Sequence, residues 1–179
     1  MDRYMILNER DSRHEQVLWA ARQMMTAART APKAKGVDIV EVALVSGEEQ
    51  QALAQRMQQL AVEQKRPSFE RDGGNLLQAE CVILIGTREM AMGLNCGHCG
   101  SATCGARAEG VPCAFNVMDV GIAVGSACAM ASDLRVDTRV MYSAGLVAMQ
   151  MGYLKGCHSV LAIPVSASSK NPFFDRQPK

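Results

Sequence analysis

The sequence predicts one layered domain of the α/β or α+β class, with two long helices packed on a sheet. Its 179 residues fit a single domain, and we assign residues 1–179 to it. Hydrophobic residues make up 48% of the chain and charged residues 21%, which is typical of a globular protein. Segments with helical periodicity alternate with short apolar segments, and this alternation predicts the layered architecture.

The N-terminal half contains two predicted helices and two predicted strands. Residues 12–32 begin with a Ser-x-x-Glu capping box and continue with apolar residues at helical spacing, so we expect a helix. Residues 37–45 read as a strand, and a second capping box opens a predicted helix over 46–63. Residues 66–80 are polar and broken by proline and glycine, and no element is predicted there. Residues 81–86 are apolar on both faces, which indicates a central strand.

The C-terminal half repeats the alternation on a smaller scale. Asn116 can cap a helix that runs to about residue 134. Small residues recur at every fourth position of this helix, at Gly121, Gly125 and Ala129. We interpret the helix as the core helix of a soluble protein rather than a membrane span. A short strand over 138–142, a helix over 143–151 and a strand over 159–165 follow, and the tail is irregular.

Charge and hydropathy exclude several classes of partner. A net charge of +1 gives no global electrostatic reason to bind nucleic acid or a membrane surface. No apolar run approaches the roughly 18–20 residues of a membrane span, and the start MDRYMILNERD does not resemble a signal peptide. We therefore expect a cytoplasmic protein. Thiols stay reduced there, and seven cysteines cannot all pair, so metal binding or catalysis is favoured over disulfides.

The most informative segment is a cysteine-rich loop at about residues 93–115. Four cysteines lie in it with the spacing C-x2-C-x4-C-x8-C, namely Cys96, Cys99, Cys104 and Cys113. Glycines adjoin several of them, which is unfavourable inside a helix or strand. The segment therefore predicts a tight loop in which the four sulfurs share a metal ion or a cluster.

Three interpretations of this loop remain open. Four thiolates from one loop suit an iron–sulfur cluster, most simply a 4Fe-4S cubane, and the glycines let backbone N–H groups approach it. Structural zinc is the alternative, although zinc ribbons usually have two C-x2-C pairs and only one is present. In the third interpretation the cysteines are small buried residues. We favour the cluster, and we interpret the three other cysteines as buried hydrophobic residues: Cys81, Cys128 and Cys157.

A resemblance to known families adds to this interpretation. The run CGHCGSATC resembles the small four-iron four-sulfur domain of corrinoid iron–sulfur proteins. Over a longer range, residues 96–175 resemble an uncharacterised bacterial and archaeal family of ferredoxin-domain-containing proteins, and the chain is identified as a member. That family resembles a shortened flavin-dependent nitroreductase. The resemblance implies an α+β, nitroreductase-like fold, with a mixed sheet flanked by helices and the cysteine-rich loop inserted.

Several segments carry the nitroreductase resemblance. Residues 28–35 are similar to the pattern A-R-x-A-P-S-x-x-N, with Lys35 in place of the asparagine. Residues 119–123 are similar to a helix of the form D-x-G-I-A, and residues 143–145 to the glycine turn beside the flavin ring. FMN binding also needs cations for its phosphate, for which guanidinium groups are well suited. The candidate FMN residues are Arg10, Arg13, Arg29, Lys33, Lys35, Ser143, Ala144, Gly145, Lys170 and Arg176.

Two functions follow as expectations. The first is an iron–sulfur flavoprotein, an FMN-dependent, nitroreductase-like oxidoreductase that passes electrons between a cluster and FMN to an unknown acceptor. The resemblance implies a homodimer, and an electron-transfer partner protein would supply electrons. The second is a non-enzymatic module, stabilised by zinc or a cluster, with a structural, partner-binding or redox-sensing role. No catalytic acid or base is identified in the sequence.

Overall fold

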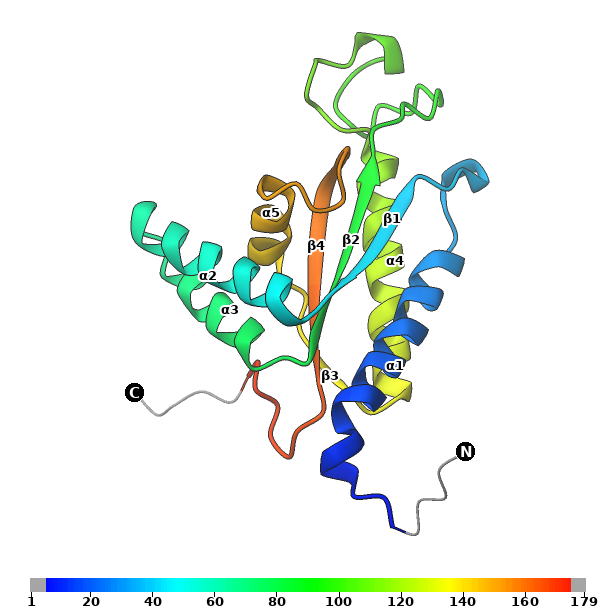
Figure 1. Ribbon diagram of the computed structural model, residues 1–179. Helices are drawn as coiled ribbons and strands as arrows, with labels where there is room; N and C mark the ends of the chain where they lie inside the picture. The colour runs from blue at the N-terminus through cyan, green and yellow to red at the C-terminus, as the bar shows by residue number, and fades with distance from the viewer. Residues whose placement is uncertain (1–5, 175–179) are drawn as a thin grey trace.

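A computed structural model, which describes residues 6–174, has a four-stranded sheet between two layers of helices (Figure 1). The strands are β1 (Val40–Val45), β2 (Cys81–Arg88), β3 (Asp137–Thr138) and β4 (Cys157–Ser166), in the order β1-β2-β4-β3. Helices α1 (Glu9–Thr30) and α4 (Ala114–Asp133) cover one face. Helices α2 (Gly47–Glu63), α3 (Pro67–Leu77) and α5 (Tyr142–Gln150) cover the other. Two short 3-10 turns are η1 (Ala34–Gly36) and η2 (Cys104–Ala106).

The sheet is antiparallel in all three ladders between the described strands, whereas a mixed sheet was expected. The connections explain the difference. Helices α2 and α3 form a hairpin that returns the chain to the end of the sheet where β1 finishes, so that Val45 pairs with Val82. Strand β2 then runs back beside β1, and it is central as predicted. The α+β class itself is confirmed.

Helix α3 is the element that was not predicted. Its sequence contains Gly73 and Gly74, which disfavour a helix in isolation. The packing of α3 on α2 explains Gly73, because a Cβ there would lie 3.0 Å from the carbonyl oxygen of Ala54. The close approach of the two helices therefore favours a residue without a side chain at this position.

Helix starts also differ from the capping predictions. Helix α1 is capped by Asn8, whose side chain accepts a hydrogen bond from the Arg10 N–H, and not by Ser12. Ser46 precedes α2 as expected but makes no side-chain capping bond. Helix α4 begins after Cys113 rather than at Asn116, and the fully buried Asn116 side chain accepts instead from the Met90 N–H. The predicted strands are all present with shifted ends, and β3 is reduced to two residues.

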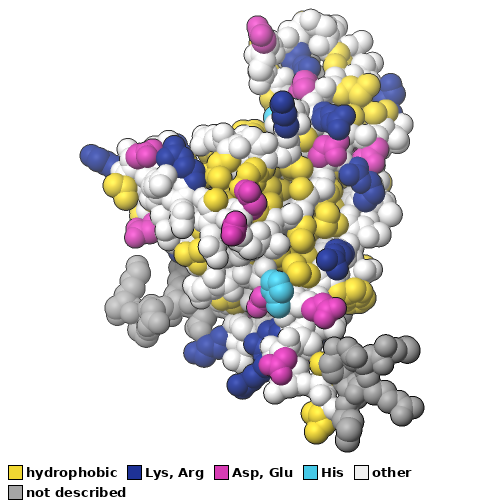
Figure 2. Space-filling model, in the orientation of Figure 1, with side chains coloured by type: hydrophobic (Ala, Val, Ile, Leu, Met, Phe, Trp, Pro, Cys, Tyr) yellow, Lys and Arg dark blue, Asp and Glu magenta, His cyan; other side chains and the backbone are white. Residues whose placement is uncertain are grey.

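Two apolar cores fill the space between the layers. Helices α1 and α4 pack on Ile83, Ile85 and Ile163 of the sheet. Helices α2, α3 and α5 pack on Val82, Leu84 and other side chains that point the opposite way. In the view of Figure 2, apolar side chains also gather between α1 and α2, over the edge strand β1.

Helix α4 is apolar on both sides but is buried on only one. It is long and apolar enough to cross a membrane by length and composition alone, and 39% of its 18-residue window is buried inside the structure. Its buried side includes Val120, Ala123 and Ala127, which pack in the core shared with α1. Val117, Met118 and Ile122 remain 42–45% exposed, and the small residues Gly121, Gly125 and Ala129 are exposed too. An uncovered apolar surface therefore runs along the outside of this helix.

Candidate functional site

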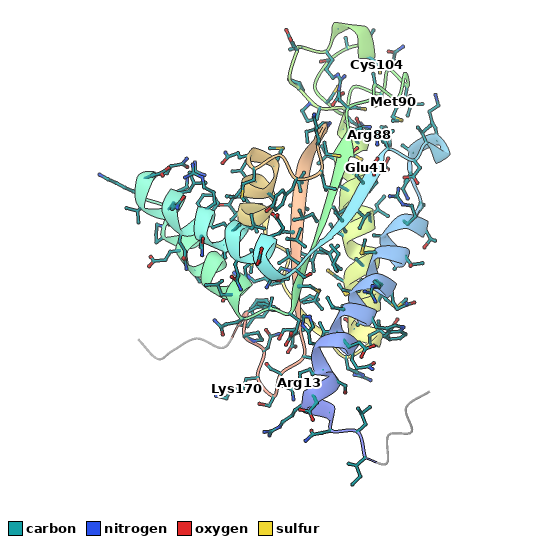
Figure 3. All side chains as sticks on the ribbon, viewed as in Figure 1. Arg13, Glu41, Arg88, Met90, Cys104 and Lys170 are labelled. Carbon is teal, nitrogen blue, oxygen red and sulfur yellow. The ribbon has the colours of Figure 1, made fainter. Side chains whose placement is uncertain are left out.

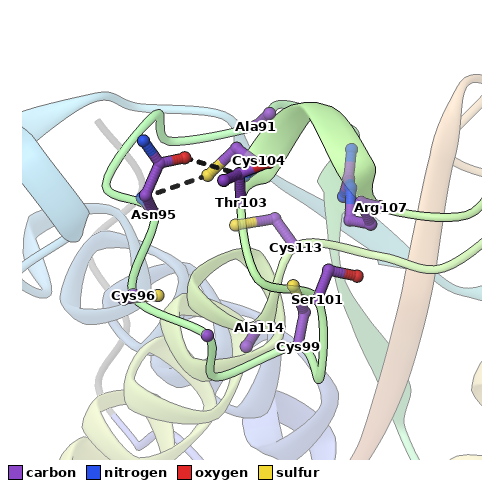
Figure 4. Close-up of a pocket in the computed structure, with 11 residues that line it drawn as sticks. Ala91, Asn95, Cys96, Cys99, Ser101, Thr103, Cys104, Arg107, Cys113 and Ala114 are labelled. Atoms are coloured by element: carbon purple, nitrogen blue, oxygen red, sulfur yellow. Dashed lines mark hydrogen bonds between the residues drawn. The ribbon is translucent and has the colours of Figure 1, made fainter.

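The cysteine-rich segment forms a loop that projects beyond the sheet, between the end of β2 and the start of α4 (Figure 1). Its four cysteines line one hollow (Figure 4). Cys113 is buried at the start of α4, Cys99 and Cys104 are half-buried, and Cys96 is exposed. All four are free thiols. Between residues 6 and 174, no group of three or more His, Cys, Asp or Glu side chains is arranged to hold a metal ion.

Left-handed backbone turns give the loop its shape. Gly97 and Gly100 have φ values of 74° and 85°, which residues with a side chain rarely adopt. The Gly100 N–H donates to the Gly97 carbonyl at 2.9 Å. This tight turn brings Cys96 and Cys99 to the same hollow. The glycines therefore serve the geometry of the cysteine pair, in agreement with the interpretation of the sequence.

Asn95 and Cys104 are joined by two hydrogen bonds across the loop. The Asn95 N–H donates to the Cys104 Sγ at 3.3 Å, and the Asn95 Oδ1 accepts from the Cys104 N–H at 2.8 Å (Figure 4). These bonds fix the third cysteine relative to the first. Asn95 was not among the residues predicted to form the site. Its residue type was the available signal, because asparagine tolerates the left-handed backbone of tight turns.

Three further contacts connect the loop to the body of the protein. Arg107 pairs with Glu89 at the end of β2, and the other carboxylate oxygen of Glu89 lies 2.8 Å from the Nε2 of His158. The hydrogen bond to Glu89 raises the pKa of the Arg107 guanidinium. The Lys35 Nζ donates to the Met92 carbonyl at 3.2 Å. The loop is therefore held from η1, β2 and β4, by residues that spacing alone could not identify.

Arg107, Glu89 and His158 also line an open groove next to the hollow, which shares Cys104 and Arg107 with it. His98 lies outside both. Its ring stacks on Phe115 of α4 with a centroid distance of 5.8 Å, and it is not among the residues that line the hollow. The imidazole therefore packs against α4 and does not face the hollow of the four cysteines.

The remaining cysteines are in apolar surroundings. Cys81 is fully buried, and burial raises the pKa of its thiol to about 12. Burial also raises the pKa of Cys157 and of Cys128, although Cys128 is only partly buried. These groups are thus protonated at neutral pH and poor metal ligands or nucleophiles.

The structure does not gather the candidate FMN residues in one place within a single protomer. Arg10 and Arg13 lie in the first turns of α1, and Arg13 and Lys170 lie at the end of the molecule opposite Cys104 (Figure 3). Arg29 lies at the other end of α1, roughly 25 Å away by the rise of the helix. One phosphate cannot contact both groups of cations. Arg176 lies outside the described residues.

Several of these candidates have structural partners. Arg29 donates to Asp38 at 2.8 Å and to the Val40 carbonyl at 2.6 Å. The Lys33 side chain is only 6% exposed and donates to the carbonyls of Arg29 and Ala31. Asp119, in the segment similar to the D-x-G-I-A pattern, accepts from the Ala34 N–H at 3.0 Å and so ties η1 to α4.

The expected glycine turn at residues 143–145 is instead part of α5, and it is buried. Ser143 donates to the buried carboxylate of Asp72 at 2.5 Å. A Cβ on Gly145 would lie 2.0 Å from the Val160 carbonyl oxygen, so α5 lies directly against β4. This segment therefore has a packing role in the protomer.

Comparison with known proteins assigns the family. Residues 109–176 match a family described as uncharacterised proteins containing a ferredoxin domain (DUF2148). An uncharacterised protein of Archaeoglobus fulgidus is 39% identical over 185 residues, which cover 98% of this chain and 100% of that protein. The chain belongs to this ferredoxin-domain family. Of the four loop cysteines, the match to the family includes only Cys113, so it does not itself identify the four-cysteine motif.

Solved structures place this ferredoxin-domain protein in the nitroreductase fold. The nitroreductase CinD from Lactococcus lactis in complex with chloramphenicol has a TM-score of 0.58 at 14% identity, covering 93% of this chain and 82% of that one. A putative nitroreductase in complex with FMN from Desulfovibrio desulfuricans has 0.57 at 14% identity, covering 89% and 79%. A nitroreductase with bound FMN from Desulfitobacterium hafniense has 0.56 at 16% identity, covering 99% and 86%. The predicted fold is confirmed, and identities this low show the fold alone.

Proposed function

We propose that the protein is a redox protein that carries an iron–sulfur cluster in the loop hollow and passes electrons to FMN. The observation that carries the proposal is that four cysteines of one loop line a single hollow, in a member of a family described as containing a ferredoxin domain. The nitroreductase fold adds support for a redox role. When bound, a cluster exchanges single electrons and a flavin one or two, so together they connect a one-electron donor to a two-electron reduction.

The donor set fits a 4Fe-4S cluster better than zinc. Zinc ribbons usually hold the ion with two C-x2-C pairs, and this loop has only one. Cluster thiolates bind different iron atoms and stand further apart. Four thiols around a hollow, with glycines and a backbone N–H directed at sulfur, are consistent with this arrangement. Cys96, Cys99, Cys104 and Cys113 would be the ligands.

The FMN part of the proposal requires two protomers. Within one protomer the candidate residues do not form a flavin site, because they divide between the two ends of α1 and the buried start of α5. In the proposal, FMN lies at a homodimer interface, where the N-terminal arginines of one protomer face the η1 region of its partner. The relatives of known structure that contain FMN support the choice of cofactor.

The exposed side of α4 is the surface we assign to the dimer. Val117, Met118 and Ile122 are half-exposed, and beside them an apolar groove between α4, α5 and β4 includes Tyr142 and Leu146. An apolar patch of this kind on a water-soluble protein is typical of an interface. Because the other side of α4 is packed in the core with α1, we propose a second copy of the chain as the occupant of its exposed side.

A partner protein would supply electrons at the loop. Met90, Leu94 and Val111 belong to the segment between β2 and α4 that contains the cysteines, and they are 40–46% exposed. Small apolar contacts of this sort suit the transient complexes of electron transfer. The proposal places the protein in the cytoplasm, where the loop thiols stay reduced.

The alternative is a cluster- or zinc-stabilised module without flavin. The observation that favours it is the burial of Ser143, Ala144 and Gly145, together with the bond from Lys35 to Met92. FMN titration of cluster-loaded protein separates the two. We expect quenching of flavin fluorescence that saturates at about one FMN per protomer, and bleaching of bound flavin when the cluster is reduced. Absence of FMN binding would overturn the flavoprotein proposal and leave the module.

A further inference from the structure

Asn95 is bonded to one proposed cluster ligand in two ways. Its N–H donates to the Cys104 Sγ at 3.3 Å, while its Oδ1 accepts from the Cys104 N–H at 2.8 Å. The two bonds close a ring between residues nine positions apart in the sequence, and both residues line the hollow (Figure 4). The two hydrogen bonds therefore fix Asn95 and Cys104 relative to each other.

The backbone of Asn95 is in the left-handed region, with a φ of 46°. The other described left-handed residues between 93 and 110 are all glycines, at positions 93, 97, 100 and 110. Glycine would satisfy the backbone at position 95 as well. Asparagine is tolerated in this conformation and adds an acceptor, so its side chain has a purpose beyond the turn.

We propose that Asn95 is a positioning residue that raises the reduction potential of the cluster, by holding its own N–H against the Cys104 sulfur. This inference rests on the function proposed above. The thiol sulfur in the structure stands in for a thiolate, which is a better acceptor. Reduction adds one negative charge to a cluster and its thiolates, so an N–H donor stabilises the reduced form more than the oxidised form. The Oδ1 bond to Cys104 keeps the donor in place.

Three variants distinguish the contributions of the two hydrogen bonds. Asn95→Ala loses the acceptor and disfavours the left-handed backbone, so both bonds weaken. Asn95→Gly loses the acceptor but keeps the left-handed backbone and its N–H. Asn8→Ala is the matched control, because Asn8 also bonds a backbone N–H but caps α1 at the far end of the molecule.

The readout is the midpoint potential of anaerobically reconstituted protein, with iron measured on the same sample. A hydrogen bond that stabilises the reduced form about tenfold more than the oxidised form raises the potential by about 59 mV for one electron. We expect Asn95→Ala to lower the potential by this amount and Asn8→Ala to leave it unchanged. Asn95→Gly should lower it by much less but lose iron several times faster than the wild type, because the loop is no longer locked.

The outcomes distinguish this inference from the proposed function. Wild-type protein that binds no iron contradicts the proposed function. If the wild-type protein holds a cluster and Asn95→Ala has the same potential and the same iron content, the role of Asn95 is overturned. The proposed function is not affected by that result. If Asn95→Ala does not retain iron, the potential and the rate of cluster loss are compared between Asn95→Gly and the wild type. Asn95→Gly with the wild-type potential and the wild-type rate of cluster loss would overturn the inference.

Discussion

Ser143 has a structural contact that the sequence did not predict. The sequence resemblance assigned it to the flavin site, whereas its hydroxyl donates to the buried Asp72 carboxylate and joins α5 to α3. Removing the hydroxyl leaves a buried acceptor with one partner fewer, which costs about 1–3 kcal/mol. We expect Ser143→Ala to lower the free energy of unfolding by that amount in urea denaturation, with FMN affinity unchanged. Ser132→Ala is the control, since Ser132 is exposed on α4. A loss of FMN affinity without a loss of stability would restore the flavin role.

Cys81 gives the folded protein a pH dependence. Its thiol pKa rises from 9.0 to about 12, chiefly because it is buried in β2. The folded protein therefore holds this proton more tightly than the unfolded chain. The resulting stabilisation is complete below about pH 9 and is lost as the pH rises toward 12. We expect the urea midpoint of Cys81→Ala to fall less steeply than that of the wild type across this window, in the presence of a reductant. Parallel curves would refute this assignment.

At the scale of elements, the contact between α5 and β4 depends on Gly145. A Cβ there would lie 2.0 Å from the Val160 carbonyl oxygen, and backbone cannot move aside as a side chain can. Overpacking of this kind costs about 1–3 kcal/mol or more. Gly74 in α3 is the matched control, because it is helical and nothing lies within 4 Å of its added Cβ. In thermal or urea unfolding, Gly145→Ala should destabilise the protein and Gly74→Ala should stabilise it by about 0.5–1 kcal/mol. Equal effects would contradict the packing argument.

The same elements show how far the sequence could predict the structure. Helices α1, α2 and α4 and strand β2 have apolar patterns that are local, so their positions were predicted to within a few residues. Helix α3 was missed because Gly73 is explained only by the approach of α2, which is a tertiary contact. The four cysteines were recognisable by spacing. Asn95, Arg107 and Glu89 were not, since their partners lie nine or more residues away and no local pattern marks them.

At the scale of the whole molecule, the exposed apolar side of α4 is the feature that a protomer alone does not explain. Ile122 is 44% exposed on it. A charge at this position would be buried without a partner in the proposed homodimer, which is strongly unfavourable. We expect sedimentation velocity to give a dimer for the wild type and a monomer for Ile122→Glu. Val62→Glu is the control, because Val62 is an apolar residue on α2 with 81% exposure, and it should remain dimeric. A monomeric wild type, or a dimeric Ile122→Glu, would rule out this interface.

The cluster is the claim on which the rest depends, and one measurement tests it most directly. Protein purified without oxygen and reduced with dithionite is examined by EPR, with iron, sulfide and zinc determined on the same sample. We predict about four iron and four sulfide per chain and the signal of a reduced cluster. Both should be lost in Cys104→Ser and kept in Cys128→Ser, since Cys128 lies on α4 away from the hollow. One zinc per chain with no iron would contradict the account.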